Sequence, residues 1–238
     1  MVNWFKRRSK RTDVPKLRPR SADQAARKVD LAELTPPLLH FLGQSSYLQL
    51  TIFENLGRAV ANAPTTDAKE SLSRVAALSL DKHHALTAQI ERHGNKPGPV
   101  MEPFTADIDF FQRSTTGNDW YETVMACYLT AGFLDDFYVR LAAGLPGDYS
   151  ARVTAALTAD SGADRLADEL RRGIEANPRL ASRLAMWGRR LVGDTMLVAR
   201  AGIAASANHD SDEARIEPVF TELIAAHTRR MDALGLTA

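Results

Sequence analysis

Apolar residues recur at spacings of three and four along most of this chain, which is the pattern of helices that bury one face. Runs that alternate apolar and β-branched residues with polar ones, as strands do, are missing. The pattern therefore predicts an all-α protein. Four long helices are expected at about 44–62, 67–93, 119–143 and 179–206, with shorter ones at 148–159, 163–175 and 212–233.

Turn and capping residues place the ends of these helices. Asp67 and Glu70 have capping-box spacing, so the second long helix is expected to begin near Asp67. It should stop at Gly94, where proline and glycine follow closely. Only a tight turn separates the first two long helices, which predicts that they are antiparallel neighbours. Residues 95–117 form a connection that is long enough to cross a bundle and apolar enough to pack on it.

Charge divides the chain into two parts. Residues 1–30 hold ten Lys/Arg against three acids, whereas the remaining residues hold twenty Lys/Arg against twenty-six Asp/Glu. The formal net charge of +1 thus conceals a basic leader on a mildly acidic body. We expect a flexible basic tail at 1–30 and one helical domain at 31–238. Such a tail is suited to RNA phosphate or to an anionic lipid surface.

Cysteine content and hydropathy indicate a cytoplasmic protein. The single cysteine, Cys127, excludes an intramolecular disulfide and lies in an apolar run, as expected of a small core residue. No stretch of eighteen uncharged apolar residues is present, so no transmembrane segment is expected. The basic leader is not followed by the apolar region of a secretory signal.

Four acidic residues stand out, because each interrupts the apolar stripe of a different predicted helix. They are Glu54, Asp81, Glu122 and Asp194. His84 follows Asp81 by three residues and shares its helix face, so the two side chains can hold one ion. Inward carboxylates from four helices, with a histidine three residues after an acid, are the architecture of ferritin-like di-metal proteins. The sequence therefore predicts a ferritin-like four-helix bundle with one long crossover, extra short helices, and a site for iron, manganese or zinc.

Each candidate ligand also has a structural alternative. The alternatives are Glu54 paired with Arg58, Asp81 paired with Lys82 or Arg74 on a solvated face, Glu122 in a capping box with Asp119, Asp194 paired with Arg190, and His84 as a structural histidine. Two further acids lie in the third long helix. Asp136 is expected either to support the metal ligands without binding the metal or to have a structural role with Arg140, and Asp135 is expected to be exposed.

Three segments resemble actinobacterial ferritin-like proteins that are grouped with the MiaE-like family, the tRNA hydroxylases of methylthio-isopentenyladenosine. The segments are Asp119–Val124, Tyr128–Tyr138 and Leu184–Asp194. The resemblance covers about residues 35–235. It implies two iron ions held by Glu54, Asp81, His84, Glu122 and Asp194, and a di-iron monooxygenase that hydroxylates a modified adenosine in tRNA, which the basic tail would help to bind.

The chain departs from that family pattern in three places. Aspartate replaces glutamate at 81 and 194, and Leu197 stands where the second histidine ligand belongs. The ligand set is therefore incomplete, and the sequence leaves open whether the protein is an enzyme. The alternative is a non-catalytic ferritin-like scaffold with a decayed metal site, which binds a partner or forms a homodimer.

Overall fold

The computed structural model describes residues 31–203 and 213–237, and within them it is all-helical, as predicted. A 3-10 turn, η1 (Leu31–Leu34), precedes the long helices α1 (Leu38–Ala61), α2 (Thr66–Arg92), α5 (Trp120–Ala142) and α8 (Arg179–Ile203). The connection between α2 and α5 holds α3 (Pro97–Met101), η2 (Glu102–Phe104) and α4 (Thr105–Ser114). The remaining helices are α6 (Tyr149–Thr158), α7 (Ala163–Ala176) and α9 (Glu213–Asp232).

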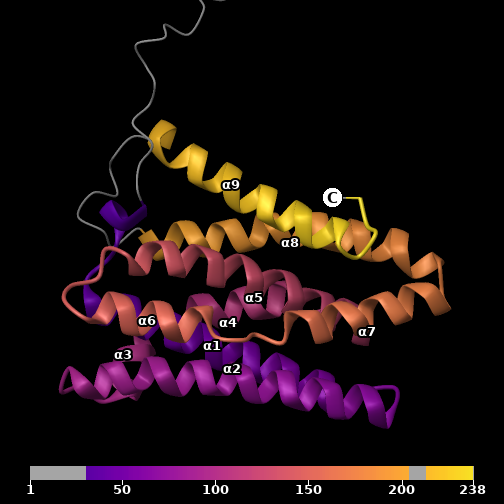
Figure 1. The fold of residues 1–238 in the computed structure, drawn as a ribbon, viewed down its shortest axis with the longest axis horizontal. Helices are drawn as coiled ribbons and strands as arrows, with labels where there is room; N and C mark the ends of the chain where they lie inside the picture. Colours follow the sequence, from indigo (N-terminus) through magenta and orange to yellow (C-terminus); the bar gives the residue numbers. More distant parts are fainter. Residues whose placement is uncertain (1–30, 204–212, 238) are drawn as a thin grey trace, which may run out of the picture.

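The long helices form a bundle in which α5 is central. Helices α1 and α2 make an antiparallel hairpin, α5 contacts α1 and α8, and α9 packs on α5 and α8 (Figure 1). Helices α6 and α7 contact both α2 and α5 and cover the space between them. In the described part of the chain, no helix is long and apolar enough to cross a membrane. The predicted tail at 1–30 lies outside the described residues.

Two groups of buried side chains make up the core. One includes Phe41, Phe133 and Phe137 and continues onto α9 through Phe220. The other joins α1, α2, α5 and α8 with α7, and Trp187 is among its members. Burial of such large apolar side chains from several helices is the main stabilising contribution to a bundle of this kind.

The predicted boundaries are close for most helices, and two differ for local reasons. Helix α1 begins six residues earlier than predicted, because Pro37 occupies the N-cap position and the helix continues directly from it. Helix α2 is capped by Thr65, whose side chain accepts a hydrogen bond from the backbone N–H of Ala68 at 3.1 Å. The predicted Asp67 cap is therefore wrong by two residues.

The crossover is helical and lies against the bundle. A β-carbon at Gly43 would collide with the backbone carbonyl oxygen of Val100 and with the ring of Phe104. Glycine at this position allows α3 and η2 to approach α1 closely. The crossover thus packs on the body, as its apolar residues predicted.

Candidate functional site

Three of the five predicted metal ligands lie on the outside of the bundle. Glu54, Asp81 and His84 are exposed, so the prediction that they face inward is wrong. On α2 the buried stripe contains the two residues between Asp81 and His84, namely Lys82 and His83. Asp81 and His84 share their face with exposed residues, including two alanines whose small side chains resemble an apolar stripe in sequence but need no burial.

Glu122 is buried, as predicted, but its carboxylate already has partners. Its Oε2 accepts hydrogen bonds from the backbone N and side-chain Nδ2 of Asn118, at 2.8 and 2.9 Å. Its own backbone N–H donates to Oδ1 of Asp119 at 2.9 Å, as a helix cap requires. Arg183 of α8 forms ion pairs with both Asp119 and Glu122. Glu122 therefore takes part in capping helix α5 with Asp119, which was the structural alternative to metal binding.

Two of the other structural alternatives are also present, whereas Lys82 and Arg74 pair with Asp135 and Glu70 and not with Asp81. The Oε2 of Glu54 lies 3.8 Å from Nη2 of Arg58, and the Oδ2 of Asp194 lies 4.0 Å from Nε of Arg190. In each pair the two residues are one helical turn apart.

Across the described residues, no three His, Cys, Asp or Glu side chains come together in a group that could hold a metal. The five predicted ligands therefore do not fit a dinuclear iron centre. Glu54, Asp81 and His84 point outward. Glu122 is held by Asn118 and Arg183, and Asp194 lies beside Arg190.

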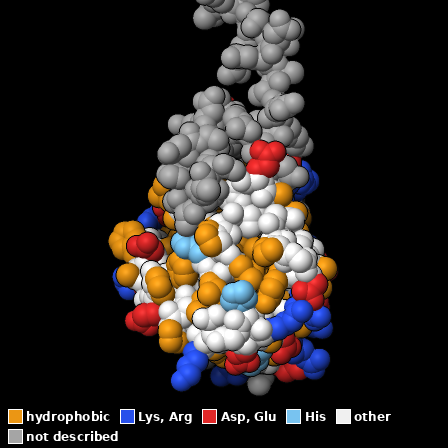
Figure 2. Space-filling view, turned by 90° about the vertical axis from the view of Figure 1, so that its left-hand side faces the viewer, with side chains coloured by type: hydrophobic (Ala, Val, Ile, Leu, Met, Phe, Trp, Pro, Cys, Tyr) orange, Lys and Arg blue, Asp and Glu red, His pale blue; other side chains and the backbone are white. Residues whose placement is uncertain are grey.

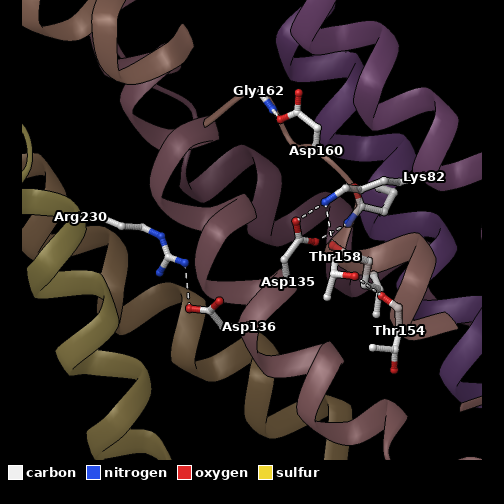
Figure 3. A network of polar contacts seen from close by, with 10 residues as sticks. Lys82, Asp135, Asp136, Thr154, Thr158, Asp160, Gly162 and Arg230 are labelled. Atoms are coloured by element: carbon white, nitrogen blue, oxygen red, sulfur yellow. Dashed lines mark hydrogen bonds and ion pairs between the residues drawn. The ribbon is translucent and has the colours of Figure 1, made fainter. Parts of the chain in front are cut away.

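A different polar group occupies the interior between α1, α2 and α5. The Lys82 Nζ lies 2.6 Å from Oδ2 of Asp135 and donates a second hydrogen bond to the carbonyl oxygen of Leu157 at 2.9 Å. The Gln49 Nε2 donates to the other oxygen of Asp135 at 2.8 Å. Figure 3 shows Lys82 and Asp135 pointing toward one another from facing helices. We call Gln49, Lys82 and Asp135 the central polar cluster.

This cluster is a buried ion pair with little free space. The side chains of Lys82 and Asp135 are only 3% and 14% exposed. Burial raises the pKa of the Asp135 carboxyl, and the Lys82 ammonium and the Gln49 amide oppose that rise. A cavity beside the cluster has a volume of about 10 Å³ and is also lined by Cys127 and Ser161. That is room for about one water molecule.

Sequence reasoning missed this cluster. Asp135 was predicted to be exposed, and Lys82 was considered only as a surface partner of Asp81. The available signal was the position of Lys82 in the same stripe as Leu72, Val75 and Leu86. His83, the next residue of the buried stripe, lies 2.9 Å from the carbonyl oxygen of Ser46 through its Nδ1 and so links α2 to α1.

Asp136 has a structural role, but its partner differs from the predicted one. Its Oδ2 pairs with Nη2 of Arg230 at 2.8 Å, which ties α5 to α9 (Figure 3). Arg140 pairs instead with Glu222 at 2.7 Å. Gly132 makes room for this contact, since a β-carbon there would collide with the guanidinium of Arg230.

The fold and the arrangement of its long helices agree with a comparison to known families. A family model described as "Ferritin-like domain, actinomycetes" matches residues 36–212. The chain belongs to this family. No curated protein matches it. The ferritin-like family thus accounts for the bundle with its long crossover, and this ferritin-like protein carries a lysine–aspartate pair inside it.

Proposed function

We propose that this ferritin-like protein is a non-catalytic helical scaffold that binds a partner molecule, and that the central polar cluster is an internal structural device. The observation that supports the proposal is the buried Lys82 ammonium. It lies between the long helices, where ferritin-like di-metal proteins direct carboxylates at metal ions. A protein-borne positive charge already balances the buried carboxylate.

Electrostatics make the cluster a poor place for a metal ion. A divalent cation there would be repelled by Lys82, whose Nζ is held by two acceptors. The second oxygen of Asp135 is used by Gln49. Moving the ammonium away would leave the carbonyl of Leu157 without that hydrogen bond, and an unpaired buried acceptor is costly.

Metal analysis tests the proposal. Protein that is expressed with added iron and then purified should contain well under one equivalent of iron per chain, and chelator should leave its melting temperature unchanged. Glu54→Ala and His84→Ala should behave as the control Glu91→Ala does, because all three residues are exposed. Two equivalents of iron per chain that are lost in Glu54→Ala or His84→Ala, and kept in the control, would overturn it.

The di-iron hydroxylase of a modified tRNA adenosine stays a prediction, and its support is the resemblance of the three sequence segments. Since the predicted ligands do not fit a dinuclear iron centre, we derive no reaction step from it. A cytoplasmic location, tRNA binding through residues 1–30 and a homodimer also stay predictions. Comparing the hydroxylated adenosines in tRNA from wild-type and deletion strains tests the hydroxylase directly.

A further inference from the structure

The outer side of α8 carries exposed arginines and no exposed acid. One side of this helix packs on α5, and the exposed residues of its other side lie within an arc of about 120° along the whole helix. None of these exposed residues is Asp or Glu, and five are arginines, namely Arg179, Arg183, Arg189, Arg190 and Arg200. They extend over about 30 Å of the helix. We call the exposed residues of α8 the outer face of α8.

Exposed bases without exposed acids are a local feature of this protein. Residues 31–238 hold twenty Lys/Arg against twenty-six Asp/Glu, and Figure 2 shows acidic and basic side chains interspersed around the end of the bundle that it views. Arg183 pairs with acids at the start of α5, and Nε of Arg190 lies 4.0 Å from Oδ2 of Asp194. Arg189 donates instead to the backbone carbonyl oxygen of Thr237 at 2.8 Å, which neutralises no charge. The outer face therefore keeps a positive charge.

Large apolar side chains are exposed on the same face. Met186 and Leu197 are 61% and 67% exposed. The other two exposed large hydrophobic side chains of the described residues, Phe110 and Ile224, lie on α4 and α9, which both contact α8. Ile224 is one turn from Phe220, whose ring lies under an arginine of α8, so it belongs to the side of α9 that meets α8. Exposed apolar side chains thus gather on and beside the basic face.

This combination indicates the chemistry of the partner. Guanidinium groups bind phosphate in a bidentate manner, and large apolar side chains gain free energy when they leave water. A bilayer with anionic lipids offers phosphate and an apolar phase at one surface, whereas the backbone of a nucleic acid offers Met186 and Leu197 no apolar phase. Residues 1–30, with ten Lys/Arg against three acids, add a second attraction to such a surface.

We propose that the outer face of α8 lies on a bilayer that contains anionic lipids. Arg179, Arg189 and Arg190 bind the phosphates of the headgroups, and Met186 and Leu197 enter the boundary between headgroups and acyl chains. The assignment rests on the proposed binding function and names the class of partner.

Sedimentation of the full chain with vesicles tests the partner. Binding to vesicles of phosphatidylcholine and phosphatidylglycerol should exceed binding to phosphatidylcholine alone at least about tenfold, and it should weaken as salt is added. Equal binding to both kinds of vesicle would overturn the proposal. Binding to a short RNA duplex without binding to either vesicle would assign the face to nucleic acid and would overturn it as well.

Charge reversal separates the outer face from the basic leader. Arg179→Glu combined with Arg189→Glu should weaken binding to the mixed vesicles at least about tenfold. The control, Lys69→Glu combined with Arg74→Glu, makes the same change in net charge at exposed positions of α2, on the opposite side of the bundle (Figure 1), and should bind as wild type does. Circular dichroism checks that both variants are folded. Equal binding of the two variants would refute a role of this face.

A fluorescent probe shows which side of the bundle meets the lipid. The single cysteine, Cys127, is buried, so a cysteine introduced at the surface can be labelled selectively. Nitrobenzoxadiazole on Leu197→Cys should shift its emission to the blue with the mixed vesicles, whereas the same probe on Ala88→Cys, exposed on α2, should not. No shift at Leu197→Cys, or an equal shift at both positions, would refute the proposal. These results do not depend on metal content, so failure of this inference is distinguishable from failure of the scaffold.

Discussion

Replacing Lys82 by methionine is the sharpest test of the central polar cluster. Methionine has nearly the length of the lysine stem and fills the same space, so the main change is loss of the ammonium. Asp135 would keep Gln49 as a partner but lose the contact at 2.6 Å, and the carbonyl of Leu157 would lose a donor. Breaking a buried ion pair by removing one member costs about 3–5 kcal/mol, because it leaves an uncompensated charge in the interior.

We expect the lower part of that range, about 3 kcal/mol, because the Asp135 side chain is 14% exposed and keeps one hydrogen bond. For a protein of this size that corresponds to a fall in melting temperature of about 6–12 °C. Urea denaturation with linear extrapolation measures the free energy of unfolding. The control is Arg92→Met, which breaks the exposed ion pair with Asp148 and should cost much less.

The double variant Lys82→Met, Asp135→Leu separates lost charge balance from lost packing. Removing both charges should restore most of the stability, because replacing a whole buried pair by apolar residues is often neutral or stabilising. The destabilisation of Lys82→Met should also shrink as the pH falls, since a protonated Asp135 is cheaper to bury. A cost below about 1 kcal/mol for Lys82→Met would refute the reasoning, as would additive costs in the double variant.

Three further predictions concern other parts of the core. Gly132→Ala should displace Arg230 from Asp136, because its β-carbon collides with the flexible guanidinium end of Arg230, so Asp136→Asn should cost less unfolding free energy in Gly132→Ala than in wild type; an equal cost in both backgrounds would contradict this. Burial lowers the pKa of His227 below 6.5, so as the pH falls the unfolded chain binds a proton at this histidine before the folded protein does. Stability should therefore fall as the pH drops through about 6.5. Melting temperatures at pH 7.5 and 5.5 should differ less in His227→Gln than in wild type. Burial raises the pKa of Cys127 to about 12, so a thiol reagent should label it in urea and not in the native protein, and rapid native labelling would show that this region opens.

The helices themselves could be predicted because their signals are local. Long periodic segments and the caps at Asp119 and Gly94 depend on neighbours within a few residues, and α2 and α5 end within two residues of the predicted positions. The Glu122 cap was foreseen for the same reason. Because only a short turn separates α1 from α2 in the sequence, their antiparallel pairing could be predicted.

The candidate site could not be predicted from such local signals. One step of 100° along α2 separates the exposed Asp81 from the buried Lys82, and the alanines on the exposed side blurred that difference. Asp135 became an interior residue only because α2 presents an ammonium to it. Asp136 was expected to pair with Arg140 on its own helix, and its partner proved to be Arg230 on α9.

An all-helical, ferritin-like chain could be predicted because periodicity, caps and turn residues act over a few positions. Which polar residues are buried depends instead on how the helices pack against one another. A buried charge is costly unless a partner compensates it, and for Lys82 and Asp135 that partner is found by packing rather than by spacing along the chain. Lys82 and Asp135 are 53 residues apart, and the fold brings them together.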